Sequence, residues 1–291
     1  MRVPSNSARD VRKYYASLLS RLYDGREALC IIELLLEKYF GMSRIDIALN
    51  DNLRLNESEL LQINSSVKEL LKGKPIQYLL GETEFCGLKF IVDENVLIPR
   101  PETAEIVERI IDNSVGGEKI LDLGTGSGCI AVTLAKRIPD AAVTAIDISE
   151  GALSIARRNA AYSDAKVDFR HDDILNLHLG DDEQFDIIVS NPPYVCESEK
   201  SQMHKNVKDF EPSEALFVHD DEPLIFYRAI FETAKRHLKE NGIIYLEINE
   251  RFGAGMKSLA SEYGFGEIMI LKDFREKDRC LTAKKKSGWI L

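Results

Sequence analysis

From residue 118 onward the sequence alternates short apolar runs with amphipathic stretches, and this alternation constrains the fold more than any other feature. Apolar runs typical of buried strands occupy residues 119–123, 141–147, 166–169, 185–189, 242–248, 267–271 and 279–283. Helical spacing of apolar residues is found at residues 129–138, 151–162, 222–239 and 253–263. The alternation predicts an α/β fold with a doubly wound, mainly parallel seven-stranded sheet and helices on both faces. No helix separates the last two runs, which predicts an antiparallel edge strand.

The first quarter of the chain has a different pattern. Residues 7–73 show helical spacing throughout, with Gly41 as a stop signal and Asn56 followed by Glu59 as a capping box. Residues 74–99 change to a period of two around Gly87, which predicts a β-hairpin linker. Pro101 suits the first turn of a helix that runs to about residue 113. We therefore expect an all-helical domain over residues 1–73, a hairpin linker over 74–99 and the α/β domain over 100–291.

Composition excludes several classes of protein. The formal net charge is −10, which opposes the basic footprint of a nucleic-acid-binding protein. The five cysteines are widely spaced and contain no C-x-x-C pair, so neither a metal site nor a disulfide framework is indicated. No apolar run approaches membrane-spanning length. These features favour a reducing, cytoplasmic setting.

A glycine-rich loop joins the strand at 119–123 to the helix at 129–138. Its residues are Gly124, Thr125, Gly126, Ser127 and Gly128. Glycines at this place let a ligand press against the backbone and direct a helix N-terminus at it. The G-x-G-x-G spacing matches neither the dinucleotide fingerprint nor a triphosphate-binding loop.

Three acidic residues lie at or just after the ends of the next two predicted strands. Asp147 ends the strand at 141–147, where a carboxylate can accept both hydroxyl groups of a ribose. Asp172 and Asp173 follow the third strand, and one of them is placed to accept an adenine amino group. A glycine loop with a ribose acid and no phosphate clamp fits S-adenosylmethionine best.

The strand at 185–189 ends in the sequence Asn191-Pro192-Pro193-Tyr194. Each proline locks its φ angle and lacks an N–H, so these residues form a rigid corner with fixed acceptors. The Asn191 side chain and the Pro192 carbonyl can hold both N–H bonds of a planar amide or amine, and Tyr194 offers a flat face beside them. The loop and the corner follow strands that are neighbours in a doubly wound sheet, so the corner faces the methyl group of the donor.

Several longer motifs carry a resemblance over nearly the whole chain. They are Gly73-Lys-Pro-Ile-Gln-Tyr78, Val96-Leu-Ile-Pro-Arg-Pro-Glu-Thr103, Asp122-Leu-Gly-Thr-Gly-Ser-Gly128, Ser190-Asn-Pro-Pro-Tyr194, Phe210-Glu-Pro212 and Leu246-Glu-Ile248. With them the chain resembles the bacterial peptide chain release factor N(5)-glutamine methyltransferase family. The resemblance implies a Rossmann-like methyltransferase domain that methylates the glutamine in the Gly-Gly-Gln motif of peptide chain release factors. It also implies an amino-terminal helical domain that helps hold the factor.

The resemblance assigns roles residue by residue. It implies that the donor is touched by the loop Gly124–Gly128. It also implies donor contacts from Asp147, Asn191 and the acidic position at Asp173. It implies that Asn191, Pro192, Pro193 and Tyr194 hold the glutamine, with Asn191, Pro192 and Tyr194 as the catalytic residues. Four positions depart from the family pattern, namely Ala104, Asn249, Phe252 and Glu276.

Two other functions use the same residues. Adenine-N6 methyltransferases of DNA and RNA share the Asn-Pro-Pro-Tyr corner, but they need a basic recognition surface that this acidic chain does not display. A donor-binding interaction module without catalysis is the other alternative, and the intact corner argues against it.

Overall fold

The computed structural model describes residues 5–286, which form two compact units. One unit contains the residues up to Gly81 together with Lys205–Phe210. The other contains Glu82–His204 and the residues from Glu211 onward. The segment Lys205–Phe210 therefore belongs to the first unit although the chain on both sides of it belongs to the second.

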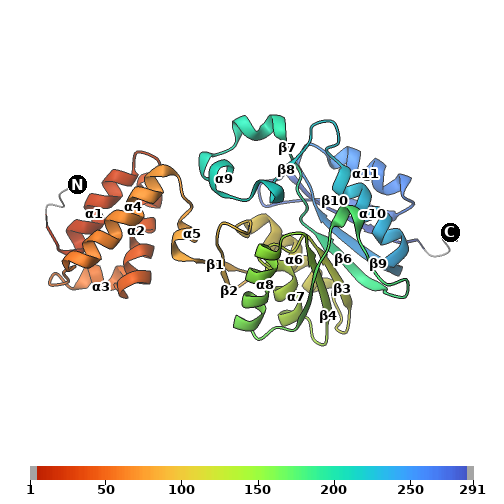
Figure 1. Ribbon diagram of the computed structural model, residues 1–291, viewed down its shortest axis with the longest axis horizontal. Coiled ribbons are helices and arrows are strands. Elements are labelled where there is room, and N and C mark those ends of the chain that lie inside the picture. Colours follow the sequence, from red (N-terminus) through yellow and green to blue (C-terminus); the bar gives the residue numbers. More distant parts are fainter. Residues whose placement is uncertain (1–4, 287–291) are drawn as a thin grey trace. The chain divides into compact units, whose positions relative to one another are not determined.

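The first unit is helical (Figure 1). Its helices are α1 (Ala8–Leu19), α2 (Gly25–Phe40), α3 (Arg44–Leu49), α4 (Glu57–Lys72), α5 (Ile76–Leu80) and α9 (Lys205–Phe210). The predicted capping box at Asn56 and Glu59 opens α4, and Gly41 ends α2 with a φ of 65°. Helix α3 lies within the range predicted to be helical. Helix α5 lies within residues 74–99, where a period-two pattern was expected, so that expectation is wrong over these residues. Its five residues are too few to show amphipathic spacing in the sequence.

A two-stranded hairpin opens the second unit. Strand β1 (Glu82–Phe85) pairs antiparallel with β2 (Leu88–Ile91) across the two residues Cys86 and Gly87. Both turn residues have positive φ angles, 48° and 74°, as a tight hairpin turn requires. The predicted hairpin is confirmed.

The main sheet has seven strands in the order β10-β11-β9-β6-β3-β4-β5. Their bounds are β3 (Lys119–Leu123), β4 (Ala142–Asp147), β5 (Val167–His171), β6 (Phe185–Ser190), β9 (Leu238–Glu247), β10 (Gly266–Lys272) and β11 (Asp278–Lys284). The pairs among β5, β4, β3, β6 and β9 are parallel, and β11 is antiparallel to both of its neighbours. The antiparallel strand is thus confirmed, but its expected place at the edge is wrong. The last strand inserts between β9 and β10 because it folds back from β10 as a hairpin and pairs with β9 on its other side.

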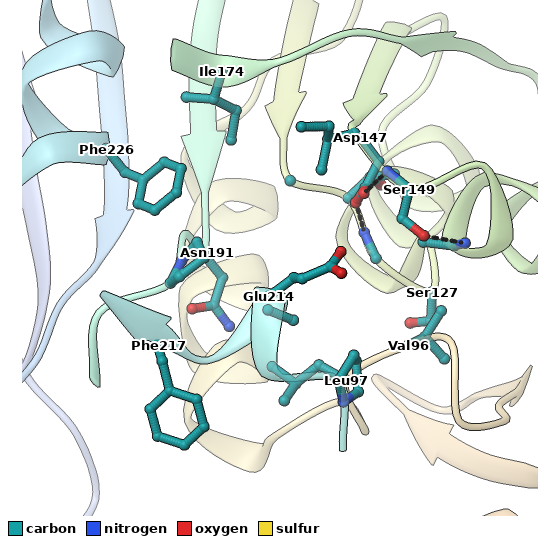
Figure 2. Close-up of a pocket in the computed structure, with 18 of the residues that line it drawn as sticks. Val96, Leu97, Ser127, Asp147, Ser149, Ile174, Asn191, Glu214, Phe217 and Phe226 are labelled. Carbon is teal, nitrogen blue, oxygen red and sulfur yellow. Dashed lines mark hydrogen bonds between the residues drawn. The ribbon is translucent and has the colours of Figure 1, made fainter. Parts of the chain in front are cut away.

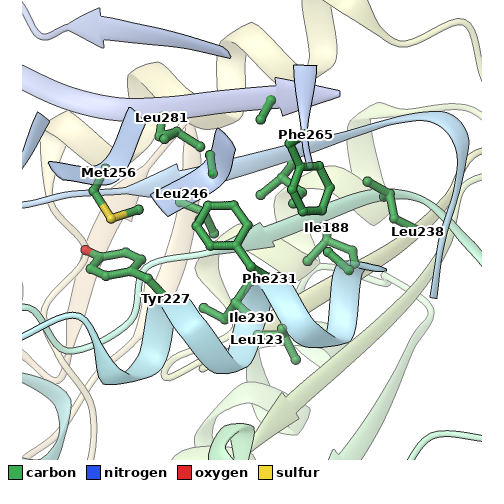
Figure 3. Packing of buried hydrophobic residues seen from close by; sticks show 14 of the residues in the cluster. Leu123, Ile188, Tyr227, Ile230, Phe231, Leu238, Leu246, Met256, Phe265 and Leu281 are labelled. Atoms are coloured by element: carbon green, nitrogen blue, oxygen red, sulfur yellow. The ribbon is translucent and has the colours of Figure 1, made fainter. Parts of the chain in front are cut away.

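Helices cover both faces of this sheet (Figure 1). Helices α6 (Pro101–Asn113), α7 (Cys129–Arg137) and α8 (Glu150–Tyr162) lie on one face, and α10 (Ile225–His237) and α11 (Gly253–Glu262) on the other. Successive strand residues alternate between the two cores, so Ile120 packs with the first group and Leu121 with the second. Figure 3 shows Tyr227, Ile230 and Phe231 of α10 directed at the strands. The predicted doubly wound sheet is confirmed.

Short elements lie between β6 and α10. Strand β7 (Val195–Cys196) pairs with β8 (Phe217–Val218), and the 3-10 helices there are Glu197–Gln202 and Ser213–Ala215. Another 3-10 helix, Ile174–Asn176, follows β5. None of the helices within residues 5–286 has both the length and the apolar character needed to cross a membrane.

Candidate active site

Strand register brings four positions of the site into one row at the carboxyl end of the sheet. Ser190 pairs with Leu246 on one side and with Leu123 on the other, and Leu123 pairs with Ile146. The residues that follow these partners are Glu247, Asn191, Gly124 and Asp147, so they lie side by side in this order across the sheet. The Ser190 hydroxyl ties two of these strands together by donating to the Leu123 carbonyl at 2.6 Å.

The glycine loop is shaped by three left-handed backbone positions. Gly124, Gly126 and Gly128 have φ angles of 74°, 55° and 79°. A Cβ atom on Gly128 would lie 3.0 Å from the Cβ of Ala156, so this glycine allows α7 and α8 to pack closely. A Cβ atom on Gly126 would meet nothing within 4 Å, which leaves the backbone there open to a ligand.

Asp147 supports the loop from the neighbouring strand. Its two carboxylate oxygens accept hydrogen bonds from the Gly126 N–H at 2.8 Å and the Ser149 N–H at 2.9 Å. Burial raises the pKa of Asp147, while these backbone donors oppose the shift. Each oxygen keeps a second lone pair, so the carboxylate can still accept hydroxyl groups of a ligand.

The two candidate acids after β5 have different surroundings. Asp173 lines the cavity described below, and its carboxylate accepts the Leu175 N–H. Asp172 is absent from that lining, and its carboxylate accepts the N–H groups of Asp173 and His178. The structure therefore separates two residues that the sequence left equivalent.

A cavity of about 480 Å³ is lined by three of the four positions in the row, Asn191, Gly124 and Asp147. Its lining includes all of the loop except Gly128, together with Asp147, Asp173, Asn191 and Pro193. Figure 2 shows the Glu214 carboxylate directed into the cavity between Asn191 and Asp147. The volume is in the range of small-molecule sites. Together with the open backbone at Gly126 and the ribose-type acceptor Asp147, it fits a nucleoside ligand.

Apolar side chains close the cavity from several segments. They are Val96 and Leu97 before α6, Ile148 after β4, Ile174 and Leu175 after β5, and Phe217 and Phe226. Phe217 and Phe226 lie on the side of Asn191, as Figure 2 shows. No sequence signal identifies these walls, because an apolar residue looks the same in the sequence whether it lines a cavity or fills a core.

Asn191 stands at the floor of the cavity. Its side-chain Nδ2 donates to the Thr103 hydroxyl at 3.4 Å, and Thr103 donates to the Glu247 carboxylate at 2.6 Å. Pro193 also lines the cavity, whereas Pro192 is buried between them. The corner thus presents polar groups at the point where β6 ends.

Tyr194 lies beneath the corner. Its ring packs against the core on the α10 side, and its hydroxyl donates to Glu247 at 3.0 Å. Burial next to the Glu247 carboxylate raises the pKa of Tyr194 far above its ordinary value. Tyr194 is not among the cavity-lining residues, so its contact with a substrate stays a prediction.

Within residues 5–286, no group of three or more His, Cys, Asp or Glu side chains is arranged to hold a metal ion.

Solved structures of methyltransferases share this fold. A methyltransferase from Pyrococcus furiosus is 20% identical, with a TM-score of 0.51, and the match covers 77% of this chain and 98% of that chain. A 16S rRNA methyltransferase of T. thermophilus in complex with AdoMet and guanosine is 21% identical, with a TM-score of 0.51, covering 70% of this chain and 50% of that one. At this level of identity the likeness concerns the fold alone.

Sequence comparison is more specific. Residues 10–81 match the family described as PrmC N-terminal domain, and residues 103–209 match the methyltransferase small domain. The release factor glutamine methyltransferase of Flavobacterium psychrophilum is 44% identical over 94% of this chain and 97% of its own length. That of Bacteroides thetaiotaomicron is 42% identical over 94% of this chain and 99% of its own length. With both parts of the chain matched at this level, the chain belongs to the release factor glutamine methyltransferase family.

Proposed function

We propose that this protein transfers a methyl group from S-adenosylmethionine to the side-chain amide nitrogen of the glutamine in the Gly-Gly-Gln motif of peptide chain release factors. The main support is that Asn191 and the glycine loop line the same cavity, in a chain that matches its curated relatives over almost its whole length. Such a cavity can hold a donor and an acceptor side by side. Proximity of this kind supplies much of the rate enhancement in a transfer between two substrates.

The donor side of the site uses the loop and its acids. Gly124, Thr125, Gly126, Ser127 and Gly128 cradle the donor. Asp147 accepts the ribose hydroxyls, and Asp173 accepts the adenine amino group. S-adenosylmethionine supplies an electrophilic methyl group on a sulfonium when it is bound. The carboxylates of Asp147, Asp173 and Glu214 give the lining an acidic character that suits this cation.

The acceptor side uses the corner. An amide nitrogen is a weak nucleophile because its lone pair is shared with the carbonyl. The Asn191 Oδ1 and the Pro192 carbonyl accept the two N–H bonds and turn the nitrogen toward the methyl group. As positive charge develops on that nitrogen, both acceptors interact with it more strongly than in the ground state, which lowers the barrier. Pro193 keeps the corner rigid, and Tyr194 supports it.

The remaining parts of the chain serve the protein substrate. We assign the helical residues up to 73 to holding the release factor, residues 74–99 to linking, and residues 100–291 to methyl transfer. We infer a cytoplasmic setting, because all five cysteines are free and the cytoplasm keeps thiols reduced.

The test is incubation of the protein with a release factor and labelled donor, followed by mass spectrometry. We expect one methyl group on the glutamine of the Gly-Gly-Gln motif and none on a factor in which that glutamine is replaced. Asn191→Ala should lose most of the turnover and keep most of the donor affinity. A folded protein that binds the donor and leaves the release factor unmodified would overturn the proposal. Label in DNA or RNA instead would support the adenine-N6 alternative.

A further inference from the structure

A hydrogen-bonded chain runs from the floor of the cavity into the core of the second unit. The Asn191 Nδ2 donates to Thr103 Oγ1 at 3.4 Å, and Thr103 Oγ1 donates to Glu247 Oε2 at 2.6 Å. The other oxygen of Glu247 accepts the Tyr194 hydroxyl at 3.0 Å. Glu247 is 1% exposed and Thr103 is 2% exposed, so water does not compete for the bond between these two side chains.

The direction of each bond follows from the chemistry of Glu247. An ionised carboxylate can only accept, so both hydroxyl groups that touch it must donate their protons to it. Thr103 has one hydroxyl proton, and this proton is used in the hydrogen bond to Glu247. The Thr103 oxygen can then only accept from Asn191, which forces the NH₂ end of the Asn191 amide toward Thr103. The Oδ1 end is left for the cavity.

Burial raises the pKa of Glu247, and the hydroxyls of Thr103 and Tyr194 and the Arg279 guanidinium on β11 oppose that shift. Both hydroxyl groups donate to the carboxylate in the structure, which is the arrangement of its charged form. The Tyr227 hydroxyl donates to the Glu247 backbone carbonyl at 2.9 Å and fixes the strand end on the α10 side. The register of β6 and β9 places Glu247 beside Asn191.

We propose that Glu247 and Thr103 are positioning residues that orient the Asn191 side-chain amide, so that its oxygen and not its nitrogen faces the substrate. This inference rests on the proposed function, in which Asn191 accepts an N–H bond of the glutamine amide. In Glu247→Gln the new side-chain NH₂ group can donate to Thr103, so the Thr103 hydroxyl can donate to the Asn191 oxygen instead. The Asn191 side-chain amide then rotates by about half a turn and presents its NH₂ group to the substrate N–H group, so that two donors face each other.

The first test compares three threonine variants. Thr103→Val removes the hydroxyl from the chain, and we expect kcat to fall about 10- to 100-fold while the donor Kd stays within twofold. Thr103→Ser keeps the hydroxyl and should retain most of the wild-type kcat. Thr133→Val is the matched control, because Thr133 is fully buried on α7 and its hydroxyl has no partner. Loss of kcat in Thr103→Ser as large as in Thr103→Val would overturn the hydrogen-bond account.

The second test uses Glu247→Gln, alone and combined with Thr103→Val. If both residues act through one chain, the double variant should be no slower than the slower single variant. Independent effects that multiply would contradict the proposal. The ¹⁵N–¹H resonances of the Asn191 side chain, assigned by their loss in Asn191→Ala, should shift in Glu247→Gln without any substrate present.

These readouts separate the two proposals. A wild-type protein that transfers no methyl group to a release factor would refute the proposed function, and the Asn191 resonances would still report on the orientation of the amide. A wild-type protein that is active, with Thr103→Val as fast as wild type, would refute the positioning role alone. Unchanged Asn191 resonances in Glu247→Gln would also refute it.

Discussion

The Arg100 guanidinium lies 2.6 Å from the Glu211 carboxylate and joins two segments that are 111 residues apart in the sequence. The second oxygen of Glu211 accepts the Ile98 N–H at 3.1 Å. Both segments line the cavity, through Val96 and Leu97 on one side and Pro212 and Glu214 on the other. Glu211, whose side chain is 1% exposed, therefore holds two walls of the cavity together.

Replacing Glu211 should weaken both folding and binding. In Glu211→Ala the Ile98 N–H and the Arg100 guanidinium lose their partner, so we expect the free energy of unfolding to fall by roughly 1–3 kcal/mol. The donor Kd should rise because the two walls are no longer tied. Urea denaturation and calorimetry measure both effects. Glu108→Ala is the control, since the Glu108–Arg137 pair is partly exposed and should contribute less than about 1 kcal/mol. Equal losses of stability in the two variants would contradict this role of Glu211.

Asp172 and Asp173 form a natural pair of test and control. Asp173 lines the cavity, and we expect Asp173→Ala to raise the donor Kd about tenfold through the loss of one hydrogen bond to a charged acceptor. Asp172 is engaged by His178 outside the lining, so Asp172→Ala should leave the donor Kd within twofold. Calorimetric titration of both variants gives the comparison. The reverse order of affinities would show that the adenine lies nearer to Asp172.

Much of the fold could be predicted because its signals are local. The capping box at Asn56, the stop at Gly41 and the apolar runs of the sheet each depend on a few neighbouring residues. The place of β11 could not be predicted, since strand order depends on pairings between distant segments. The grouping of Lys205–Phe210 with the helical unit is likewise a property of tertiary contacts.

Site residues could be predicted only where their type and their place at the end of a strand together indicate a binding role. The glycine loop, Asp147 and Asn191 carry such signals, and the structure places them around one cavity. Glu211 and Glu247 lie in motifs that carry the family resemblance, but their roles need partners that are more than 100 residues away. Phe217 and Phe226 carry no signal that separates a cavity wall from a core.

Asp122 should make stability depend on pH. Burial, opposed by the Thr125 hydroxyl and reinforced by the Asp147 carboxylate, raises the pKa of Asp122 from 3.8 to about 7. Between these values the folded protein binds a proton that the unfolded chain does not bind. The stability that this carboxyl contributes is therefore fully present below about pH 4 and is lost as the pH rises through about 7.

The check is urea denaturation of the wild type and of Asp122→Asn between pH 5 and pH 8. The variant cannot ionise at this position, so its free energy of unfolding should fall less steeply with rising pH than that of the wild type. The difference between the two should change by at most about 1.4 kcal/mol per pH unit. Parallel curves would mean that Asp122 does not titrate in this range.

Glu276 stands where the family pattern has a glycine, and its φ angle is 61°. A side chain in this left-handed region costs more than glycine does. We expect Glu276→Gly to raise the free energy of unfolding by roughly 0.5–1 kcal/mol. Thermal unfolding measures the change. Lys277→Gly, at a neighbouring residue without a positive φ, should lower stability instead, and a gain in both variants would contradict the strain argument.

Glu214 should favour the donor over its product. Its carboxylate points into the cavity, and its charge adds to the shift in the Asp147 pKa. S-adenosylmethionine carries a sulfonium charge that S-adenosylhomocysteine lacks, so a carboxylate in the cavity stabilises the donor more than the product. Glu214→Gln should therefore weaken donor binding about two- to fivefold and leave product binding unchanged, an effect that shrinks with added salt. Glu232→Gln, at an exposed position on α10 outside the cavity, is the control. Equal weakening of donor and product in Glu214→Gln would assign this side chain to packing rather than to charge recognition.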